Sequence, residues 1–455
     1  MKKRLTIISL LTVLLATGCR FIPRRDPSSS SKDVSDPITS QDPDGSEGDI
    51  SEDSEGNLVF EDVTINYGNP ITGADGMAMR QLVRDFNAEY EGQIHVNETF
   101  MAEIEYYEAL NLTIPMKRAY DVALVHSYKV AAFANQGMIF PMDELITDAK
   151  LEIKREDYIG SVYDAMKFEN KHYGVPLDIH TTILYYNKDL LAQYEAEVPT
   201  NRTELIAAAK KMPNTNAGGW GLPLSTTWPS EYIYTTAFYQ FDGVEIDSNN
   251  KPAYNNQKGV DALHSVADLI HKDKISPLNV SVDTDLMLFN QGKAMFHING
   301  DWMINNVKES GVNFGVTSLS KMFNENGANS TKLASRSHAF VLPDGRNITV
   351  RQQAALVFMK WMTEHAHIWA EGGGHVPASN IARERAEYLA LPYHADYGEV
   401  SDFKLNPTSP YYYEAFSPVF QQITFALQNA NYDAQALLDD AADEGWQTVL
   451  EAMDS

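Results

Sequence analysis

The sequence predicts an α/β protein built on a mainly parallel sheet. Segments with strand character alternate with segments whose apolar residues recur at helical spacing, and this alternation is typical of helices layered on a sheet. The chain has 455 residues, of which 44% are hydrophobic, so it can bury a large core and form two or three domains. In sheets of this kind, ligands bind beyond the carboxyl ends of the strands.

The predicted elements begin near Leu58 and alternate along the chain. Strand patterns lie at 63–68, 94–96 and 121–126, and helical patterns lie at 79–90, 106–112 and 130–136. Tyr67 and His126 stand where two of these strands end, so topology alone makes both residues candidate ligand contacts.

Later segments fit the same fold class. Thr349 and Gln352 have the spacing of a capping box, which predicts the start of a long helix over 350–370. Three glycines at 372–374 end this helix. Residues 434–453 are predicted to form one or two terminal helices.

The first residues have the pattern of a secretion signal. Basic residues at 2–4 precede an apolar run at 5–16, which is too short to span a bilayer. Small residues then lead to Cys19, which is the only cysteine, so no disulfide can form within the chain. This pattern resembles a bacterial lipobox, in which Cys19 is lipidated and residues 1–18 are removed. The alternative is an ordinary signal peptide with an incidental cysteine.

The segment 19–57 has the composition of a tether. It is rich in Asp, Ser, Pro and Gly and has few apolar residues, so it cannot repay the entropy of ordering. We predict a disordered, acidic tether between a membrane anchor and the folded body.

Several segments in a fixed order resemble the extracellular solute-binding proteins of ABC importers, in the sugar-binding family that includes maltose-binding protein. The matching segments are 86–87, 94–96, 120–122, 133–143, 173–178, 185–190, 199–200, 204–205, 289–295, 300–302 and 372–377. Their order and spacing follow the family over roughly 60–455. Arg202 departs from it, since the family often has tryptophan there, and we expect this change to affect a helix start only.

The resemblance implies a two-lobe periplasmic-binding-protein type II fold with three hinge crossings and a central ligand cleft. By this resemblance the crossings are expected near 178–183, 335–341 and 375–382. The first lobe is expected to comprise 58–181 and 338–380, and the second 182–337 and 381–455. Closure of the lobes around the ligand is then a hinge motion.

The expected crossings carry polar side chains that can reach a ligand in the cleft. Asp178 and His180 are two residues apart on a predicted strand and therefore face the same side; the alternative is a structural pair at the hinge. The second crossing carries Arg336, Ser337 and His338, and the third carries Gly373 and His375. Arg336 binds either an anionic group of the ligand or a neighbouring carboxylate.

Two tryptophans complete the candidate site. Trp302 stands where the family often presents an aromatic side chain to the ligand, although a core tryptophan is the alternative. Trp228 lies in a loop-like segment, where exposed aromatic residues are more often functional. Aromatic rings cover the apolar face of a sugar, while carboxylates and histidines bind its hydroxyls.

The resemblance therefore predicts a lipid-anchored protein that captures a sugar or oligosaccharide and delivers it to an ABC permease at the extracellular or periplasmic face of the membrane. We predict a monomer with no cofactor, metal or catalytic residue. A binding protein for a glycerophosphodiester or another anionic polyol stays an alternative, as does a scaffold lipoprotein.

Other function classes lack support in the sequence. The net charge of −26 argues against nucleic acid as a partner, because phosphate binding needs a basic surface. We find no serine-hydrolase elbow, zinc-protease motif or phosphate-binding loop. A surface carbohydrate-active hydrolase or lyase stays open, because the acids of glycosidases have no fixed spacing in sequence.

Overall fold

The computed structural model describes residues 48–54, 58–73, 75–148, 151, 153–214, 219–343 and 350–454. The predicted signal peptide, Cys19, most of the tether and Thr349 lie outside the described residues. The expectation of disorder up to residue 57 is wrong in part, because Asp49–Glu52 form a strand whose backbone pairs with Leu58–Glu61. The described residues all fall within one compact unit. None of the helices described is both long enough and apolar enough to cross a membrane.

The first lobe is built on a five-stranded sheet with the strand order β4-β3-β5-β13-β8. Its strands are β3 (Val63–Asn69), β4 (Ile94–Phe100), β5 (Val122–His126), β8 (Gly174–Pro176) and β13 (His338–Val341). β3 pairs in parallel with β4 and β5, whereas β13 pairs antiparallel with β5 and β8. The sheet is therefore mixed, and the expectation of a mainly parallel sheet is wrong.

The direction of β13 follows from the place where the chain enters the sheet. His338, its first residue, lies opposite His126, the last residue of β5. The chain reaches this point from β12 (Leu333–Arg336) in the other sheet, with Ser337 as the sole connecting residue. A strand that enters at the carboxyl end of β5 can only run back along it, which makes the pair antiparallel.

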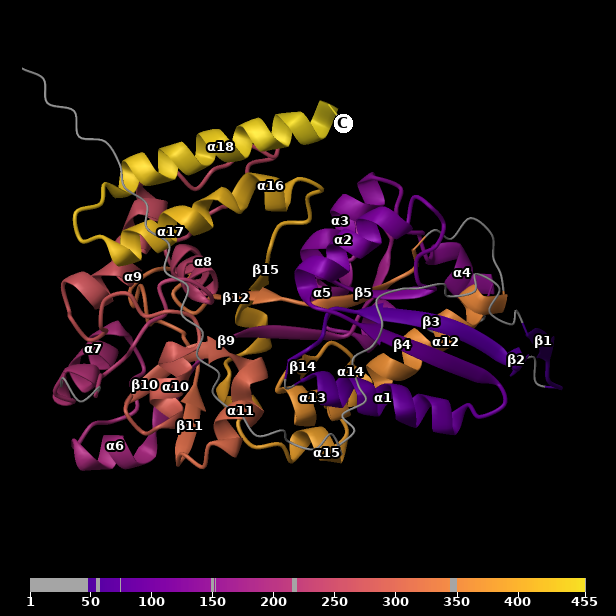
Figure 1. The fold of residues 1–455 in the computed structure, drawn as a ribbon, viewed down its shortest axis with the longest axis horizontal. Helices are drawn as coiled ribbons and strands as arrows, with labels where there is room; N and C mark the ends of the chain where they lie inside the picture. The colour runs from indigo at the N-terminus through magenta and orange to yellow at the C-terminus, as the bar shows by residue number, and fades with distance from the viewer. Residues whose placement is uncertain are drawn as a thin grey trace, which may run out of the picture. The chain divides into compact units, whose positions relative to one another are not determined.

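The second lobe is built on a six-stranded sheet with the order β10-β9-β12-β15, in which β11 and β14 also pair with β9. Its other strands are β9 (Asp178–Asn187), β10 (Phe296–Gly300), β11 (Phe314–Thr317), β14 (Val376–Pro377) and β15 (Phe403–Leu405). Only the pairing of β12 with β15 is parallel. The long strand β9 follows β8 directly and joins the two sheets (Figure 1).

Five helices cover the first sheet. They are α1 (Gly76–Glu89), α2 (Glu103–Thr113), α3 (Ser127–Asn135), α12 (Val350–Glu364) and α13 (Ala366–Gly373). The predicted long helix is thus interrupted at His365. α13 ends as expected at the glycines, because Gly374 has a φ of +79° and a Cβ there would lie 2.1 Å from the carbonyl oxygen of Asp301.

The helices of the second lobe surround its sheet. They are α6 (Lys188–Gln193), α7 (Arg202–Lys211), α8 (Ser230–Gln240), α9 (Gln257–His271), α10 (Thr284–Asn290), α11 (Ile304–Glu309), α16 (Tyr412–Phe416), α17 (Pro418–Gln428) and α18 (Ala434–Asp454). α8 packs on β12 and α9, while α16 and α17 pack beneath α18 (Figure 1). The C-terminal segment forms the single helix α18, one of the two outcomes expected.

Four 3-10 helices lie at Arg155–Asp157, Asp301–Met303, His394–Asp396 and Val400–Asp402. Other short strands and α-helices complete the described chain. They are β1 (Asp49–Glu52), β2 (Leu58–Glu61), β6 (Lys167–Phe168), β7 (Lys171–His172), α4 (Asp143–Asp148), α5 (Gly160–Asp164), α14 (Asn380–Arg383) and α15 (Ala386–Leu389). α14 and α15 pack on α12 and α13 of the first lobe. The first side chain after them to stack on the second sheet is Tyr393, against Phe314 of β11. Before α14 and α15, β14 pairs with β9 of the second sheet at Val376–Pro377, within the segment 375–382 where the third crossing is expected.

Candidate functional site

A cavity of about 550 Å³ lies at the passages between the two sheets. Aromatic and ionisable side chains from both lobes line it. The aromatic residues are Tyr128, Trp228, Tyr232, Trp302, Tyr413 and Phe420. The ionisable residues are Asp75, Glu103, His126, His180, Glu231, Arg336, His338 and His375.

One wall of the cavity is a cluster of three aromatic rings from the second lobe. The ring centroids of Trp228 and Trp302 are 6.2 Å apart at an interplanar angle of 29°, and Tyr232 lies 5.7 Å from Trp302. Trp302 lies two residues after the end of β10 at Gly300. A Cβ on Gly300 would lie only 2.1 Å from the nearest atom of the Trp302 indole. The glycine therefore leaves room for the ring. This wall presents apolar surface to a ligand.

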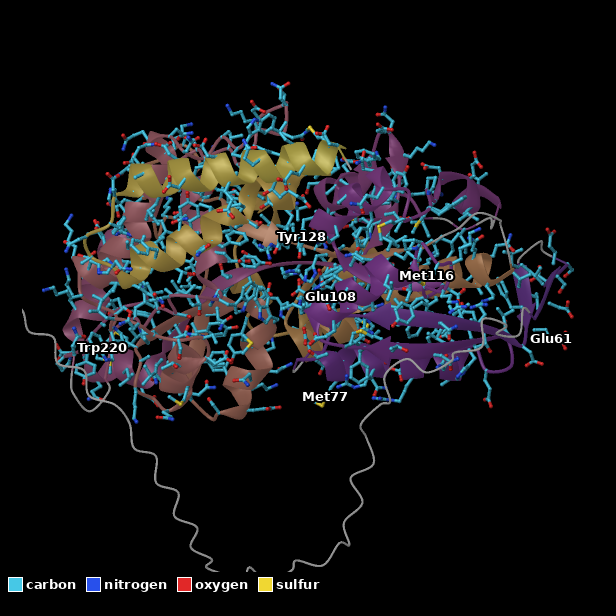
Figure 2. The ribbon with its side chains drawn as sticks, turned by 45° about the horizontal axis from the view of Figure 1, so that its top comes forward. Glu61, Met77, Glu108, Met116, Tyr128 and Trp220 are labelled. Atoms are coloured by element: carbon cyan, nitrogen blue, oxygen red, sulfur yellow. The ribbon has the colours of Figure 1, made fainter. Side chains whose placement is uncertain are left out.

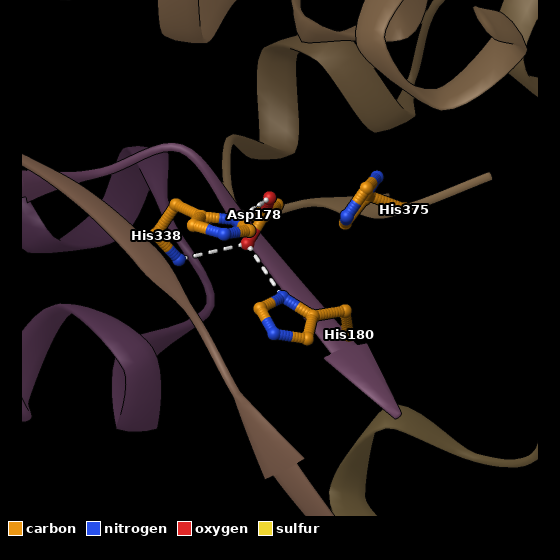
Figure 3. Close-up of side chains that lie close together, drawn as sticks. All are labelled: Asp178, His180, His338 and His375. Atoms are coloured by element: carbon orange, nitrogen blue, oxygen red, sulfur yellow. Dashed lines mark hydrogen bonds and ion pairs between the residues drawn. The ribbon is translucent and has the colours of Figure 1, made fainter. Parts of the chain in front are cut away.

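The floor of the cavity is organised by the Asp178 carboxylate at the start of β9. Asp178 is fully buried and accepts hydrogen bonds from the backbone N–H of His338 at 2.9 Å and its Nδ1 at 2.7 Å. His180 Nδ1 lies 3.2 Å from the same carboxylate, and Trp369 Nε1 donates to it at 2.7 Å. Figure 3 shows the two histidines joined to Asp178. Asp178 thus fixes side chains from two crossings.

The electrostatics of this floor favour an ion pair between the Asp178 carboxylate and the His338 imidazole. Burial raises the pKa of Asp178, but the charge of His338 and the hydrogen bonds from His180 and His338 outweigh it, so the pKa lies well below its usual range. Burial lowers the pKa of His338, but the adjacent Asp178 carboxylate raises it above its ordinary value. Burial lowers the pKa of His180 to about 4, and it also lowers the pKa values of His126 and His375.

His375 belongs to the same cluster. Its ring stacks on Trp369 with centroids 4.4 Å apart, and it lies 5.4 Å from His180 and 5.7 Å from His338. The Trp369 indole in turn donates to Asp178. These contacts tie the segment after α13 to the crossings at β9 and β13.

The first lobe supplies the opposite wall. The Tyr107 hydroxyl lies 2.7 Å from His126 Nδ1, and the Tyr128 hydroxyl donates to Glu103 at 3.2 Å. Tyr128 also stacks on Tyr413 of the second lobe, with centroids 5.6 Å apart. This wall offers hydroxyl, imidazole and carboxylate groups to a ligand.

Arg336 is held by neighbouring side chains of the cavity. Its guanidinium donates to the Glu231 carboxylate at 2.9 Å and lies over the Tyr232 ring, 4.2 Å from the centroid. Of the two roles expected for Arg336, the structure shows the salt bridge.

Seven of the predicted ligand contacts line the cavity: His126, His180, Trp228, Trp302, Arg336, His338 and His375. Asp178 lies behind the floor and positions two of them. Gly373 is buried beside His375 and is not among the lining residues described. Trp220, a further tryptophan, is not among the lining residues described. Figure 2 shows it well away from Tyr128, which does line the cavity.

Two of the predicted contacts require correction. Tyr67 is fully buried in the core, where its ring packs on Phe340 and Phe358 and its hydroxyl contacts Met79 Sδ at 3.2 Å. It points to the helix-covered face of β3, because alternate side chains of a strand face opposite sides. The Ser337 hydroxyl is buried too and donates to the carbonyl oxygen of His338.

Sequence reasoning missed several lining residues: Asp75, Glu103, Tyr128, Glu231, Tyr232, Tyr413 and Phe420. Tyr128 follows His126 by two residues at the carboxyl end of β5, so the topological rule that selected His126 also indicates Tyr128. The others come from helices or loops, and only the fold brings them to the cavity.

Comparison with known protein families gives a match over most of the chain. Residues 81–394 match the family described as bacterial extracellular solute-binding protein. A maltotriose-binding protein of Pyrococcus abyssi is 24% identical over 66% of this chain and 64% of its own length. A galactooligosaccharide-binding protein of Bacillus subtilis is 23% identical over 61% of this chain and 65% of its own. The match thus spans slightly less than two thirds of either relative.

Solved structures share the fold. An ABC substrate-binding protein of Listeria monocytogenes in complex with cycloalternan superposes with a TM-score of 0.73. The superposition covers 85% of this chain and 98% of that protein, at 20% sequence identity. The two-lobe fold expected from the sequence is therefore confirmed.

Proposed function

Because this chain belongs to the bacterial extracellular solute-binding proteins, we propose that it captures a sugar or oligosaccharide in the cavity by hinge closure and delivers it to an ABC permease. The observation that carries this proposal is the pairing of an aromatic wall with a floor and opposite wall of hydrogen-bonding groups. The relatives named above bind maltotriose and galactooligosaccharides, which supports the same ligand class.

The physical basis is the two-sided chemistry of a sugar ring. Its C–H face packs on the Trp302 and Trp228 rings, and its hydroxyls bond to acceptors such as Glu103 and the histidines of the floor. Hydrogen bonds to charged acceptors contribute about 1.5–3 kcal/mol each. After the costs of association and closure, we expect a net binding free energy of about −8 kcal/mol, which corresponds to a Kd of ~1 μM.

The charges of the cavity favour a neutral ligand over an anionic one. The cationic groups of the described lining are Arg336, which is paired with Glu231, and His338, which is paired with Asp178. An acidic ligand then faces the carboxylates of Glu103 and Asp75 without a free cationic partner in the described lining. Burial raises the pKa of Asp75, which reduces but does not reverse this repulsion.

The first prediction is selective stabilisation by neutral oligosaccharides. Maltotriose or a galactooligosaccharide at 100 times its Kd stabilises the folded protein by about 2.7 kcal/mol, which a thermal-shift screen detects readily. Glucuronate and glycerophosphodiesters at the same concentrations are expected to give no shift. The reverse pattern, or no shift with any neutral sugar, contradicts the proposal.

The family is one of binding proteins, and we propose that the captured sugar is released unchanged. Chromatography of the sugar after long incubation with the protein tests this directly. Recovery of the intact oligosaccharide supports binding alone. Appearance of shorter products identifies a hydrolase or lyase instead.

A second prediction concerns Cys19. We propose that its lipidation anchors the protein on the outer face of the cytoplasmic membrane, which suits an extracellular family. Cys19→Ser is then expected to move the protein from the washed membrane fraction to the soluble extracellular fraction, as immunoblotting of fractionated cells shows. A Ser30→Ala variant is the control. Retention of the Cys19→Ser protein on washed membranes contradicts the anchor.

A further inference from the structure

Three imidazoles and one carboxylate from separate segments of the chain meet at the floor of the cavity. We propose that His180, His338 and His375 bind a divalent transition-metal ion, with Asp178 positioning two of them. One ligand atom from each of the four residues lies within 4.8 Å of the others (Figure 3). This site goes beyond sugar capture and differs from our expectation that the protein has no metal site.

The spacing of the rings suits a metal centre. The centroids of His180 and His338 are 4.7 Å apart, and each lies 5.4–5.7 Å from the centroid of His375. Metal–nitrogen bonds of about 2.0–2.1 Å in a tetrahedral site place imidazole centroids roughly 5 Å apart. The three rings therefore lie at a separation that one ion can bridge once their side chains turn toward it.

Asp178 has the place of an outer carboxylate in a carboxylate–histidine–metal arrangement. Its oxygens contact Nδ1 of His180 at 3.2 Å and Nδ1 of His338 at 2.7 Å. His338 carries a charge beside this carboxylate, so a metal must displace its proton before the Nε2 of each ring can serve as a ligand. The same carboxylate also accepts from the backbone of His338 and from Trp369, so its position is fixed before metal binds.

His375 supplies an independent indication of a missing partner. Its side chain is buried at 1% exposure, and Nδ1 has no hydrogen-bond partner among the described residues. A buried ring nitrogen without a partner is costly, and a bound ion or an ordered water would supply that partner. Stacking on Trp369 holds the ring in place beside His180.

The proposed ion borders the sugar cavity. All three histidines line that cavity, so the fourth coordination position is open to water or to a hydroxyl of the ligand. Imidazole nitrogens suit Zn²⁺, Co²⁺ or Ni²⁺, whereas Ca²⁺ and Mg²⁺ prefer oxygen ligands. The rival explanation is that the imidazoles only bind sugar hydroxyls.

Titration of the EDTA-treated, dialysed full chain with Co²⁺ and Zn²⁺, in the absence of sugar, separates these explanations. We expect one ion per chain by calorimetry and the intense visible absorption of tetrahedral Co²⁺. His375→Gln and His180→Gln are each expected to weaken binding at least tenfold. His264→Gln, which alters a histidine of α9 bonded to Tyr432, is the matched control and is expected to bind normally.

Anomalous diffraction from wild-type crystals grown with Zn²⁺ provides a measurement independent of the variants. A peak among the three imidazoles supports the proposal, even if a variant fails to fold. A peak elsewhere, or titrations in which His375→Gln and His264→Gln bind equally, overturns it. Absence of stoichiometric binding also overturns it. Sugar binding by the metal-free protein leaves the proposed transport function untouched, so the two proposals fail separately.

Discussion

Asp178→Ala is expected to lower the free energy of unfolding by about 3–5 kcal/mol, which is the usual cost of removing one partner of a buried ion pair. The carboxylate is fully buried and is bonded to His338 through two donors, to His180 and to Trp369. Alanine leaves all these groups without their acceptor in a low-dielectric interior, and it leaves the charge of His338 uncompensated.

Urea denaturation of the ligand-free protein measures this loss. Asp164→Ala is the matched control, because Asp164 also forms ion pairs, with Arg155 and Lys167, but stands at the surface. Exposed pairs of this kind contribute about 0–1 kcal/mol. If the two variants lose the same stability, Asp178 does not organise the crossings as the structure indicates.

The sequence predicted the fold class and its order of elements, because hydrophobic periodicity reports burial along one segment at a time. The strands ending at Tyr67 and His126 and the helices that follow them are local features of this kind. The mixed direction of the first sheet was missed, since β13 joins β5 from more than 200 residues away. Local patterns carry no information on such a pairing.

The candidate site was predicted in part for a similar reason. His180, Trp302 and His338 were found because the resemblance fixed where the crossings and the family aromatic residue lie. Asp75, Tyr232 and Tyr413 were missed, because they reach the cavity only when their helices and loops pack. The proposed metal cluster has no motif either, since its histidines come from three crossings that are distant in sequence.

Trp302→Ala is expected to weaken sugar binding at least tenfold, which corresponds to about 1.4 kcal/mol or more. Trp302 is half-buried in the aromatic wall, where its ring contacts those of Trp228 and Tyr232 and meets His180 edge-to-face. A bound sugar ring loses its main apolar contact when this indole is removed. The ligand-free thermal midpoint is expected to move little, because part of the ring already faces the cavity.

Isothermal titration with the oligosaccharide found by thermal shift measures this effect, together with a melting curve of the ligand-free variant. Trp220→Ala is the matched control, because Trp220 is also half-buried but stands outside the described lining of the cavity. It is expected to bind with unchanged affinity. Trp228→Ala should give a smaller loss than Trp302→Ala, since Trp228 is 41% exposed at the rim. If Trp302→Ala binds normally but melts at a much lower temperature, Trp302 acts in packing, and the aromatic wall does not hold the ligand.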